Sequence, residues 1–328
     1  MINKKRLLLP YNMGRAGWDA ARARTDIEAV EFDDEASIEA LHAMLREVHG
    51  IALNYTHFGE AELVAAPQLQ VVGRLGVGYD TVDVPALTRH HIPLMLTGEA
   101  NSASVAEQTL AFMMALAKKT AAMDAMVRAA QWNERLTLGP ADLAGSAVLI
   151  VGFGRIGRRL AKYCLALDMP VLANDPYMPT DTIRATGCEP APVLDAAVPQ
   201  ADFVIILCPK TPDTINLFDE TRIARMKPGA FLVNTARGGM VDEAALYRAL
   251  VAGRLAGAAL DVFAQEPPPA DHPLLQLPNV VLAPHLAGVT RGALDRMAEV
   301  TVWNMLSVLD GRPNYENVLN KEVLTWTR

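Results

Sequence analysis

Three ionisable side chains in the second half of the chain each follow a short apolar stretch: Arg237 after residues 231–236, Glu266 soon after 260–263 and His285 after 280–284. A guanidinium can hold a carboxylate in a fixed fork and polarise a carbonyl. A protonated imidazole can donate to an oxygen that is becoming a hydroxyl, and a nearby carboxylate stabilises that imidazole and fixes its tautomer. Together these three groups suit hydride transfer to a 2-oxo acid.

Each of the three residues also has an ordinary structural alternative. Arg237 could pair with a surface carboxylate, Glu266 could lie in a solvated loop, and His285 could be a capping histidine. Short apolar stretches are typical of strands, and in an open parallel sheet ligands bind beyond the carboxyl ends of the strands. Because all three side chains stand at such ends, a shared site accounts for them better than coincidence.

A glycine-rich turn follows the apolar stretch 147–151. Its glycines are spaced as G-x-G-x-x-G: Gly152, Gly154 and Gly157. The first glycine permits a tight turn, the second lets a pyrophosphate approach the backbone, and the third lets helix pack on strand. The helix that follows at once, with Arg155 and Ile156 in its first turn, offers N–H groups to phosphates. The motif alone is weak, but strand, turn and helix together favour a dinucleotide site.

Two aspartates bear on which dinucleotide is bound and how. Asp175 stands 23 residues after Gly152, at the end of the next predicted strand. Its carboxylate can accept both adenosine ribose hydroxyls, and no arginine follows closely to neutralise a 2′-phosphate, so NAD is favoured over NADP. The alternative is a solvated aspartate in an ordinary turn. Asp261, within the predicted strand 258–262, could accept from the nicotinamide carboxamide or could be a buried aspartate satisfied by backbone.

The elements that must position these residues form an α/β series. In the first hundred residues the pattern predicts strands at 6–9, 51–53 and 69–75 and a helix at 37–48. A second series predicts strands at 147–151, 171–173, 203–207, 231–233, 258–262 and 280–282, with helices at 156–167 and 243–251. Such alternation favours parallel sheets with helices on their faces.

Two longer helices are predicted between and after these series. Ser104 and Glu107 have the spacing of a capping box, and the helix that follows is apolar nearly all round over 110–117, which predicts burial. The last helix, 290–309, stops before Gly311, and we expect it to pack on the first domain. Its apolar face comprises Leu294, Met297, Ala298, Thr301, Val302, Met305, Leu306 and Leu309.

Length and composition set further limits. A chain of 328 residues suits two domains, and 51% hydrophobic residues exclude a disordered protein. The net charge of −7, with no basic block, opposes nucleic-acid and membrane partners, and the longest apolar run is far short of the roughly 18 residues that a membrane span needs. Three scattered cysteines suggest neither a disulfide framework nor a cysteine zinc site, so we expect a cytoplasmic protein.

Several further stretches form distinctive motifs: residues 73–80, 101–109, 151–157, 208–212, 233–238, 260–263 with Glu266-Pro267, and Pro284-His285. In these motifs, and over nearly its whole length, the chain resembles the NAD-dependent D-isomer-specific 2-hydroxyacid dehydrogenases. The resemblance implies an α/β protein with two doubly wound parallel-sheet domains. A Rossmann domain that binds NAD, residues 102–288, would be inserted into a flavodoxin-like, discontinuous substrate domain, residues 1–101 and 289–328, with the active site in the cleft between them.

The resemblance also implies a role for each site residue and no protein-bound metal. Arg237 would bind the substrate, His285 would be the acid/base, and Glu266 would hydrogen-bond to His285. The substrate-binding set is Val77, Gly78, Arg237 and Tyr55, with the backbone near Val77 and Gly78 around the substrate carboxylate. The cofactor-binding set is Gly152, Gly154, Arg155, Ile156, Gly157, Asp175, Cys208, Thr235, Ala236, Asp261 and Gly288. Cys208 would act through its backbone and not as a nucleophile.

The chain departs from the family pattern at three positions that border the cofactor: Gln108, Leu207 and Lys210. The helix at Ser104, with Trp132 beyond it, is similar to the dimerisation arm of the family, which implies a homodimer. Core packing could also explain the methionines of that region: Met113, Met114, Met123 and Met126.

The choice of substrate turns on positive charge. A phosphorylated substrate such as 3-phosphoglycerate needs a cation near its phosphate, and the strand end 53–56, which often supplies arginine in phosphoglycerate-type members, has none. Arg74 and Arg135 leave a phosphate site open. We therefore expect a small acid such as glyoxylate or hydroxypyruvate. The alternatives are a phosphoglycerate dehydrogenase-type activity and a non-catalytic NADH-sensing interaction protein. Formate-type oxidation is disfavoured, because that chemistry is associated with glutamine where Glu266 stands.

Overall fold

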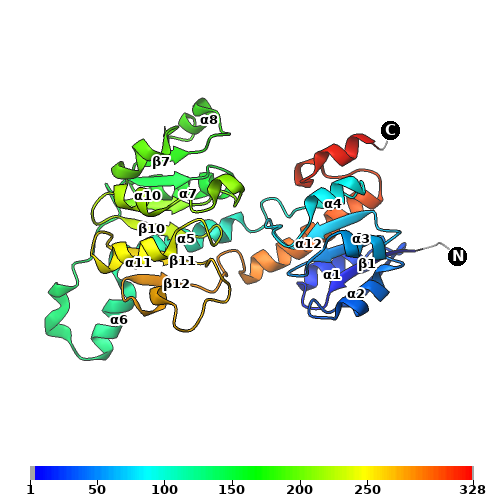
Figure 1. Cartoon of the computed structure of the whole chain (residues 1–328), viewed down its shortest axis with the longest axis horizontal. Helices are drawn as coiled ribbons and strands as arrows, with labels where there is room; N and C mark the ends of the chain where they lie inside the picture. Colours follow the sequence, from blue (N-terminus) through cyan, green and yellow to red (C-terminus); the bar gives the residue numbers. More distant parts are fainter. Residues whose placement is uncertain (1–3, 327–328) are drawn as a thin grey trace. The chain divides into compact units, whose positions relative to one another are not determined.

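The computed structural model describes residues 4–326 and divides the chain into two compact units (Figure 1). The first, here called the terminal unit, contains the residues up to Asn101 and those from Val289 onward. The second, the central unit, is Ser102–Gly288. In Figure 1 the terminal unit therefore carries colours from both ends of the bar, and the central unit carries those between.

The terminal unit is built on five parallel strands in the order β2-β1-β3-β4-β5. This order is the flavodoxin-like one that the fold class predicted. The strands are β1 Lys5–Pro10, β2 Ile27–Phe32, β3 Gly50–Leu53, β4 Val71–Arg74 and β5 Leu94–Met95. The helices are α1 Arg15–Arg22, α2 Ile38–Leu45, α3 Glu60–Ala65, α4 Val84–Arg89 and α12 Arg291–Leu309.

The two faces of this sheet bury alternate residues of the same strand. Leu8 of β1 belongs to a cluster with Leu41 and Leu45 of α2, whereas its neighbour Leu7 packs in a cluster with Val302 and Met305 of α12. Since helices cover both faces, β3 and the Leu7–Leu9 run of β1 are apolar without alternating polar residues. β2 escaped the sequence analysis because acidic side chains interrupt its apolar pattern.

The last helix closes the terminal unit. α12 contacts α1 and β4, which confirms the expectation that it packs on elements of the first hundred residues. Most of its predicted apolar face is buried, but Leu294, in the first turn of the helix, is 42% exposed. The helix is capped by the Thr290 side chain, and Gly311 follows it with a φ of 71°, a conformation that glycine adopts readily.

The central unit has seven parallel strands in the order β12-β11-β10-β9-β6-β7-β8. They are β6 Val148–Val151, β7 Val171–Asn174, β8 Glu189–Pro190, β9 Phe203–Ile206, β10 Phe231–Asn234, β11 Gly257–Leu260 and β12 Val280–Leu282. The helices are α5 Ser102–Lys118, α6 Thr120–Arg128, α7 Arg155–Ala166, α8 Thr180–Arg184, α9 Leu194–Ala197, α10 Glu220–Arg225 and α11 Glu243–Val251. The strand order reverses beside β6, which is where doubly wound sheets bind dinucleotides.

Two predictions about α5 were wrong. The helix begins at Ser102, so Ser104 lies inside it and does not cap it. It is also not buried all round, because Met114 is 38% exposed while Met113 is fully buried. Lys119, with a φ of 52°, separates α5 from α6. No helix within residues 4–326 is long and apolar enough to cross a membrane.

A cluster of charged side chains joins the C-terminal end of α12 to the residues that precede β2 and to the first residue of β1. Arg24, just beyond α1, donates from Nε and Nη2 to Asp26 at 2.7 Å and from Nη1 and Nη2 to Asp310 at 2.9 Å. The hydrogen bonds from Arg24 lower the pKa of Asp26 to about 2. Lys5 adds a bond from Nζ to the Leu309 carbonyl at 2.7 Å.

This cluster predicts how stability responds to acid. Because the pKa of Asp26 is depressed by folding, its contribution should be complete above its ordinary value of 3.8 and lost as the pH falls toward about 2. Arg24→Gln should therefore lower the urea unfolding midpoint near neutral pH, and the difference from the wild type should shrink between pH 4 and 2. Arg15→Gln, which breaks the exposed Arg15–Asp19 pair, is the control. A difference that does not change with pH would contradict the assignment.

Candidate active site

The three ionisable residues follow neighbouring strands. β10, β11 and β12 lie side by side and parallel, with Asn234 paired to Leu260 and Leu260 to Leu282 at their carboxyl ends. The loops that carry Arg237, Glu266 and His285 therefore leave the same edge of one sheet. This arrangement follows from parallel pairing alone.

Glu266 and His285 are in direct contact. His285 Nδ1 lies 2.7 Å from Glu266 Oε2, and the other carboxylate oxygen, Oε1, accepts the N–H of Phe263 at 2.9 Å. Both side chains are partly exposed, at 47% for His285 and 37% for Glu266. Because a carboxylate accepts hydrogen bonds, Nδ1 carries the proton, which leaves Nε2 as the ring atom that can exchange a proton with a bound molecule.

Asp261 holds the turn in which His285 stands. The carbonyl of Asp261 accepts the His285 N–H at 2.7 Å, and its carboxylate oxygens accept the N–H groups of Leu286 and Ala287 at 2.9 and 3.0 Å. His285 has a φ of 56°, a left-handed conformation that non-glycine residues seldom adopt. Such a conformation persists only where surrounding contacts impose it, and these three hydrogen bonds do so.

The position of Asp261 differs from the prediction. β11 ends at Leu260, so Asp261 lies just beyond the strand and not within it. Its side chain is 1% exposed, and burial raises the pKa of its carboxyl group while the bonds from Ala287 and Leu286 oppose the shift. Both oxygens thus already bind backbone, which is the alternative that the sequence left open.

The Arg237 turn is folded by a buried asparagine that the sequence analysis did not single out. Asn234, 2% exposed at the end of β10, accepts the Ala236 N–H at 3.0 Å and donates to the Arg237 carbonyl at 2.9 Å. The guanidinium of Arg237 donates to the Ala236 carbonyl at 2.7 Å. A polar residue directly after a buried strand was the available signal.

Gly238 brings the Arg237 turn against the Glu266 loop. A Cβ atom on Gly238 would lie 1.6 Å from the carbonyl oxygen of Phe263, a distance that no side chain tolerates. The two backbones can approach this closely only because the residue after Arg237 is a glycine. Segments from two adjacent strands are thereby held together at the sheet edge.

The glycine-rich turn has the geometry that a pyrophosphate requires. Gly152 has a φ of 99° and its Cβ would lie 2.4 Å from the Cys208 nitrogen, while a Cβ on Gly157 would meet the Gly152 carbonyl oxygen at 2.3 Å. At Gly154 a Cβ would meet nothing within 4 Å, so the space above it is open. α7 begins at Arg155, which leaves the N–H groups of its first turn directed out of the helix beside that space.

Asp175 lies beside this turn at the end of β7. Its Oδ2 accepts the Phe153 N–H and its Oδ1 accepts the Tyr177 N–H, both at 2.9 Å. Each carboxylate oxygen keeps a second lone pair for a hydroxyl group. The open turn, the helix N-terminus and the adjacent carboxylate together fit the pyrophosphate and ribose of a dinucleotide.

The other predicted cofactor residues lie in the same unit. The Thr235 hydroxyl, 2.8 Å from that of Thr109, is buried behind the end of β10. Burial raises the pKa of the Cys208 thiol to about 11, which disfavours the nucleophilic thiolate. Ala236 and Ile156 are partly buried, and Gly288 is the last residue of the central unit.

Apart from Arg237, the predicted substrate contacts belong to the terminal unit and follow β3 and β4. Tyr55, two residues after β3, is 69% exposed. Val77 and Gly78 follow Gly76, whose φ is 142°. Arg74 Nη1 supports this loop by donating to the Leu53 and Leu75 carbonyls at 3.1 and 3.0 Å. The Arg74 guanidinium thus supports the loop whose backbone was predicted to bind the substrate carboxylate.

Asn101 is a second polar residue that sequence reasoning passed over. It is 8% exposed, and its Oδ1 atom has no hydrogen-bond partner within the part of the chain that the structure describes. A buried amide oxygen of this kind ordinarily binds a group or a water molecule. Asn101 opens one of the motifs that carried the resemblance, which was the signal available.

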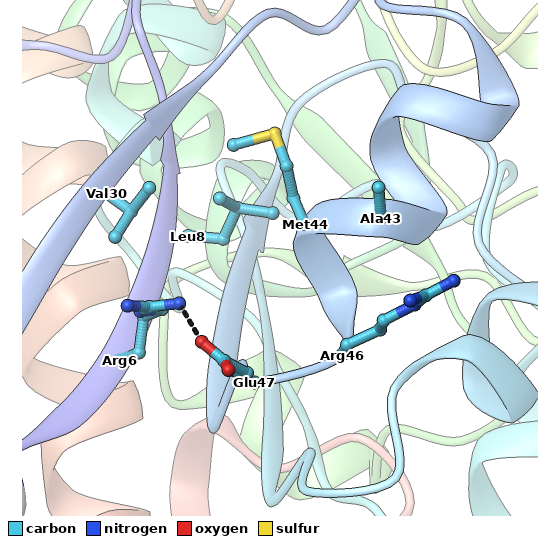
Figure 2. A pocket seen from close by; sticks show the side chains of 7 residues that line it. All are labelled: Arg6, Leu8, Val30, Ala43, Met44, Arg46 and Glu47. Atoms are coloured by element: carbon cyan, nitrogen blue, oxygen red, sulfur yellow. Dashed lines mark hydrogen bonds and ion pairs between the residues drawn. The ribbon is translucent and has the colours of Figure 1, made fainter.

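A cavity elsewhere does not belong to this constellation. A space of about 300 Å³ in the terminal unit is lined by Arg6, Leu8, Val30, Ala43, Met44, Arg46 and Glu47 (Figure 2). It lies near the beginning of β1 and the end of α2, away from the carboxyl ends of the strands. Arg6 is bound there to Glu47 at 2.5 Å and to Glu28 at 3.3 Å.

Comparisons with known proteins agree with this geometry. Residues 110–287 match the model for the D-isomer specific 2-hydroxyacid dehydrogenase, NAD binding domain. A glyoxylate reductase of Thermofilum pendens is 38% identical over 293 residues, which are 88% of this chain and 86% of that protein. The chain belongs to the D-isomer specific 2-hydroxyacid dehydrogenase family, and the residues that match its NAD binding domain all lie in the central unit.

Two further relatives show how far the likeness extends. A D-3-phosphoglycerate dehydrogenase of Archaeoglobus fulgidus is 38% identical over 77% of this chain but only 48% of its own length, so the chain spans about half of that relative. The crystal structure of the TT0316 protein of Thermus thermophilus has a TM-score of 0.85 at 33% identity and covers 96% of this chain and 99% of that one.

The Asp261 contacts predict a specific loss. Asp261→Asn replaces one of the two carboxylate oxygens with an amide N–H₂. The N–H of Leu286 or of Ala287 then loses its acceptor, so the turn that holds His285 should become less fixed. We expect kcat for 2-oxo acid reduction to fall on the order of 10²-fold, with a smaller change in NADH affinity measured by fluorescence titration. Asp202→Asn is the control, since Asp202 also accepts a backbone N–H, from Ala147. A loss confined to NADH affinity would contradict the positioning role.

Proposed function

We propose that the protein is an NAD-dependent D-2-hydroxyacid dehydrogenase that interconverts a small D-2-hydroxy acid and its 2-oxo acid. The observation that carries this proposal is the 2.7 Å contact between His285 Nδ1 and Glu266 Oε2 at the edge of an NAD-binding domain. A histidine oriented in this way can donate and remove a proton at one fixed atom.

In the proposed reaction each residue has one task. The Arg237 guanidinium holds the carboxylate of the 2-oxo acid and polarises its carbonyl. The glycine turn at Gly152–Gly157 and Asp175 would hold NADH, which would supply the hydride for the carbonyl carbon. Protonated His285 gives its Nε2 proton to the carbonyl oxygen, which becomes the hydroxyl of the product, and Glu266 stabilises the imidazolium before the transfer. Val77 and Gly78 bind the substrate carboxylate through their backbone. In the direction of oxidation, neutral His285 accepts the hydroxyl proton.

We favour glyoxylate, hydroxypyruvate or a related small acid as the substrate. The segment after β3 carries no cation, and the Arg74 guanidinium is engaged with the Leu53 and Leu75 carbonyls, which makes it a poor partner for a phosphate. The likeness to a glyoxylate reductase supports the same choice. The likeness to D-3-phosphoglycerate dehydrogenases keeps a phosphorylated hydroxy acid as the second candidate.

The Asp175 carboxylate supports NAD over NADP, since it would repel a 2′-phosphate. The three cysteines are free, which suits a reducing compartment, and we place the protein in the cytoplasm on that ground. The proposed domain roles are substrate binding by the terminal unit and cofactor binding by the central unit.

The proposal predicts the behaviour of His285→Ala. Loss of the proton donor should lower the rate of NADH oxidation with the preferred 2-oxo acid by ~10²–10⁴-fold while NADH binding is largely retained. Initial rates with glyoxylate, hydroxypyruvate, pyruvate, phenylpyruvate and 3-phosphohydroxypyruvate, each with NADH and NADPH, identify that acid and cofactor. Full activity of the variant would overturn the acid/base assignment. Tight NADH binding without turnover of any acid would favour the NADH-sensing alternative.

We also propose a homodimer formed through the arm of α6 and the 3₁₀ turn Trp132–Thr137. Neither element buries a residue within a single chain, and the apolar side chains of Val127, Trp132 and Leu136 are 59%, 61% and 87% exposed. Core packing therefore does not account for this apolar surface, whereas an interface would bury it.

The dimer proposal predicts a mass change. Light scattering should give twice the 35.5 kDa chain mass for the wild type, and Leu136→Glu should shift the protein toward the monomer, because a buried carboxylate would oppose association. Val193→Glu, at another exposed apolar residue (61%), should leave the mass unchanged. A monomeric wild type would refute the proposal.

A further inference from the structure

A second carboxylate–imidazole pair, Glu243 and His272, contacts the segment that carries Glu266. Glu243, the first residue of α11, stands at the end of the connection that carries Arg237. Its Oε1 accepts the backbone N–H of Ala264 at 2.7 Å, and its Oε2 lies 3.2 Å from Nε2 of His272. Both side chains are only 18% exposed. The pair therefore joins α11 to the segment 263–272.

The His272 ring is oriented by its contact with Glu243 and by packing on Phe263. It meets the Phe263 ring edge-on, with the centroids 5.9 Å apart, and its Nδ1 atom is buried with no hydrogen-bond partner among residues 4–326. Since the Glu243 carboxylate can only accept, His272 donates from Nε2. Glu243 thus fixes both an imidazole that packs on Phe263 and the peptide N–H that follows Phe263.

The position of the Glu266 carboxylate depends on this segment. Its Oε1 accepts the Phe263 N–H, and its Oε2 contacts His285. Any shift of residues 263 and 264 would therefore be passed directly to the Glu266–His285 contact. Gly238 lies against the Phe263 carbonyl, and Glu243 binds the N–H of the next residue, Ala264.

We propose that Glu243 is a positioning residue for the Glu266–His285 pair. Through Ala264 N–H and His272 it fixes the segment from which the Glu266 carboxylate reaches the proton donor. The proposal rests on the proposed function, because Glu266 contacts His285, which is the proposed proton donor. Glu243 itself does not contact that pair.

The chain offers a discriminating set of variants. Glu243→Ala removes both acceptor oxygens, whereas Glu243→Gln keeps one oxygen for the Ala264 N–H but turns an amide N–H₂ toward His272 Nε2. Glu220→Ala is the matched control. Glu220, the first residue of α10, forms an exposed ion pair with Arg248 of α11, 3.2 Å away. The substitution removes a carboxylate from the surroundings of α11 without touching the 263–266 segment.

The readouts are kcat, KM, the pH profile of 2-oxo acid reduction, NADH affinity and amide hydrogen exchange, all on the full-length protein. Glu243→Ala should lower kcat about tenfold with little change in NADH affinity. The pH profile of reduction should change as well, because the 2.7 Å contact between His285 and Glu266 is then no longer held in place. Exchange of the peptide that contains Ala264 should accelerate. Glu220→Ala should behave like the wild type, and Glu243→Gln should fall between the wild type and the alanine variant, because it keeps the Ala264 bond and loses the acceptor for His272.

Three results would overturn the proposal: a Glu243→Ala variant with the kcat and pH profile of the wild type, a Glu243→Gln variant as impaired as the alanine variant, or faster exchange spread over the whole central unit. The last would indicate a general loss of stability. Failure of the proposed function is a separate outcome. It would show as a wild type without turnover, and the exchange at Ala264 in the three variants would still decide whether Glu243 holds the segment.

Discussion

The site depends on the way in which Asp261 binds three consecutive backbone N–H groups. Those of His285, Leu286 and Ala287 all find their acceptors on this one buried residue. The resulting turn holds His285 in a left-handed conformation that its own backbone does not favour. Without that turn, the adjacency of β11 and β12 would bring the histidine near Glu266 but would not direct its ring. The Asp261 carboxylate is also difficult to replace, because a side chain with fewer acceptor oxygens would leave the N–H of Leu286 or Ala287 unpaired.

A second constraint is the close approach of neighbouring loops. Gly238 lets the Arg237 turn lie against the Phe263 peptide, and Gly152 does the same for the cofactor loop against Cys208. At both places a backbone, and not a side chain, forms the contact. Rigid backbone contacts transmit position better than flexible side chains do, which suits a site whose parts come from separate loops.

Much of this arrangement could be predicted from the sequence, because strands and glycine turns are local features. The apolar stretches before Arg237 and His285 gave β10 and β12, and the glycine spacing gave the β6–α7 turn. The contacts that refine the site could not be read in that way. Glu243 acts through the N–H of Ala264, which is distant in the sequence, and no local pattern marks it. The start of α5 was missed for a related reason, since Ser104 fits a cap motif that tertiary packing overrides.

The discontinuity of the terminal unit has a consequence for how the protein is made. Gly17 of α1 lies against Ala298 of α12, and Gly73 of β4 lies against Thr301 and Met305. A ribosome releases the first hundred residues long before it has synthesised these partners, so one apolar face of that sheet is then covered only by α1. The middle of the chain is complete and able to fold earlier. The nascent N-terminal segment is therefore the part that most needs shielding by chaperones until the last helix arrives.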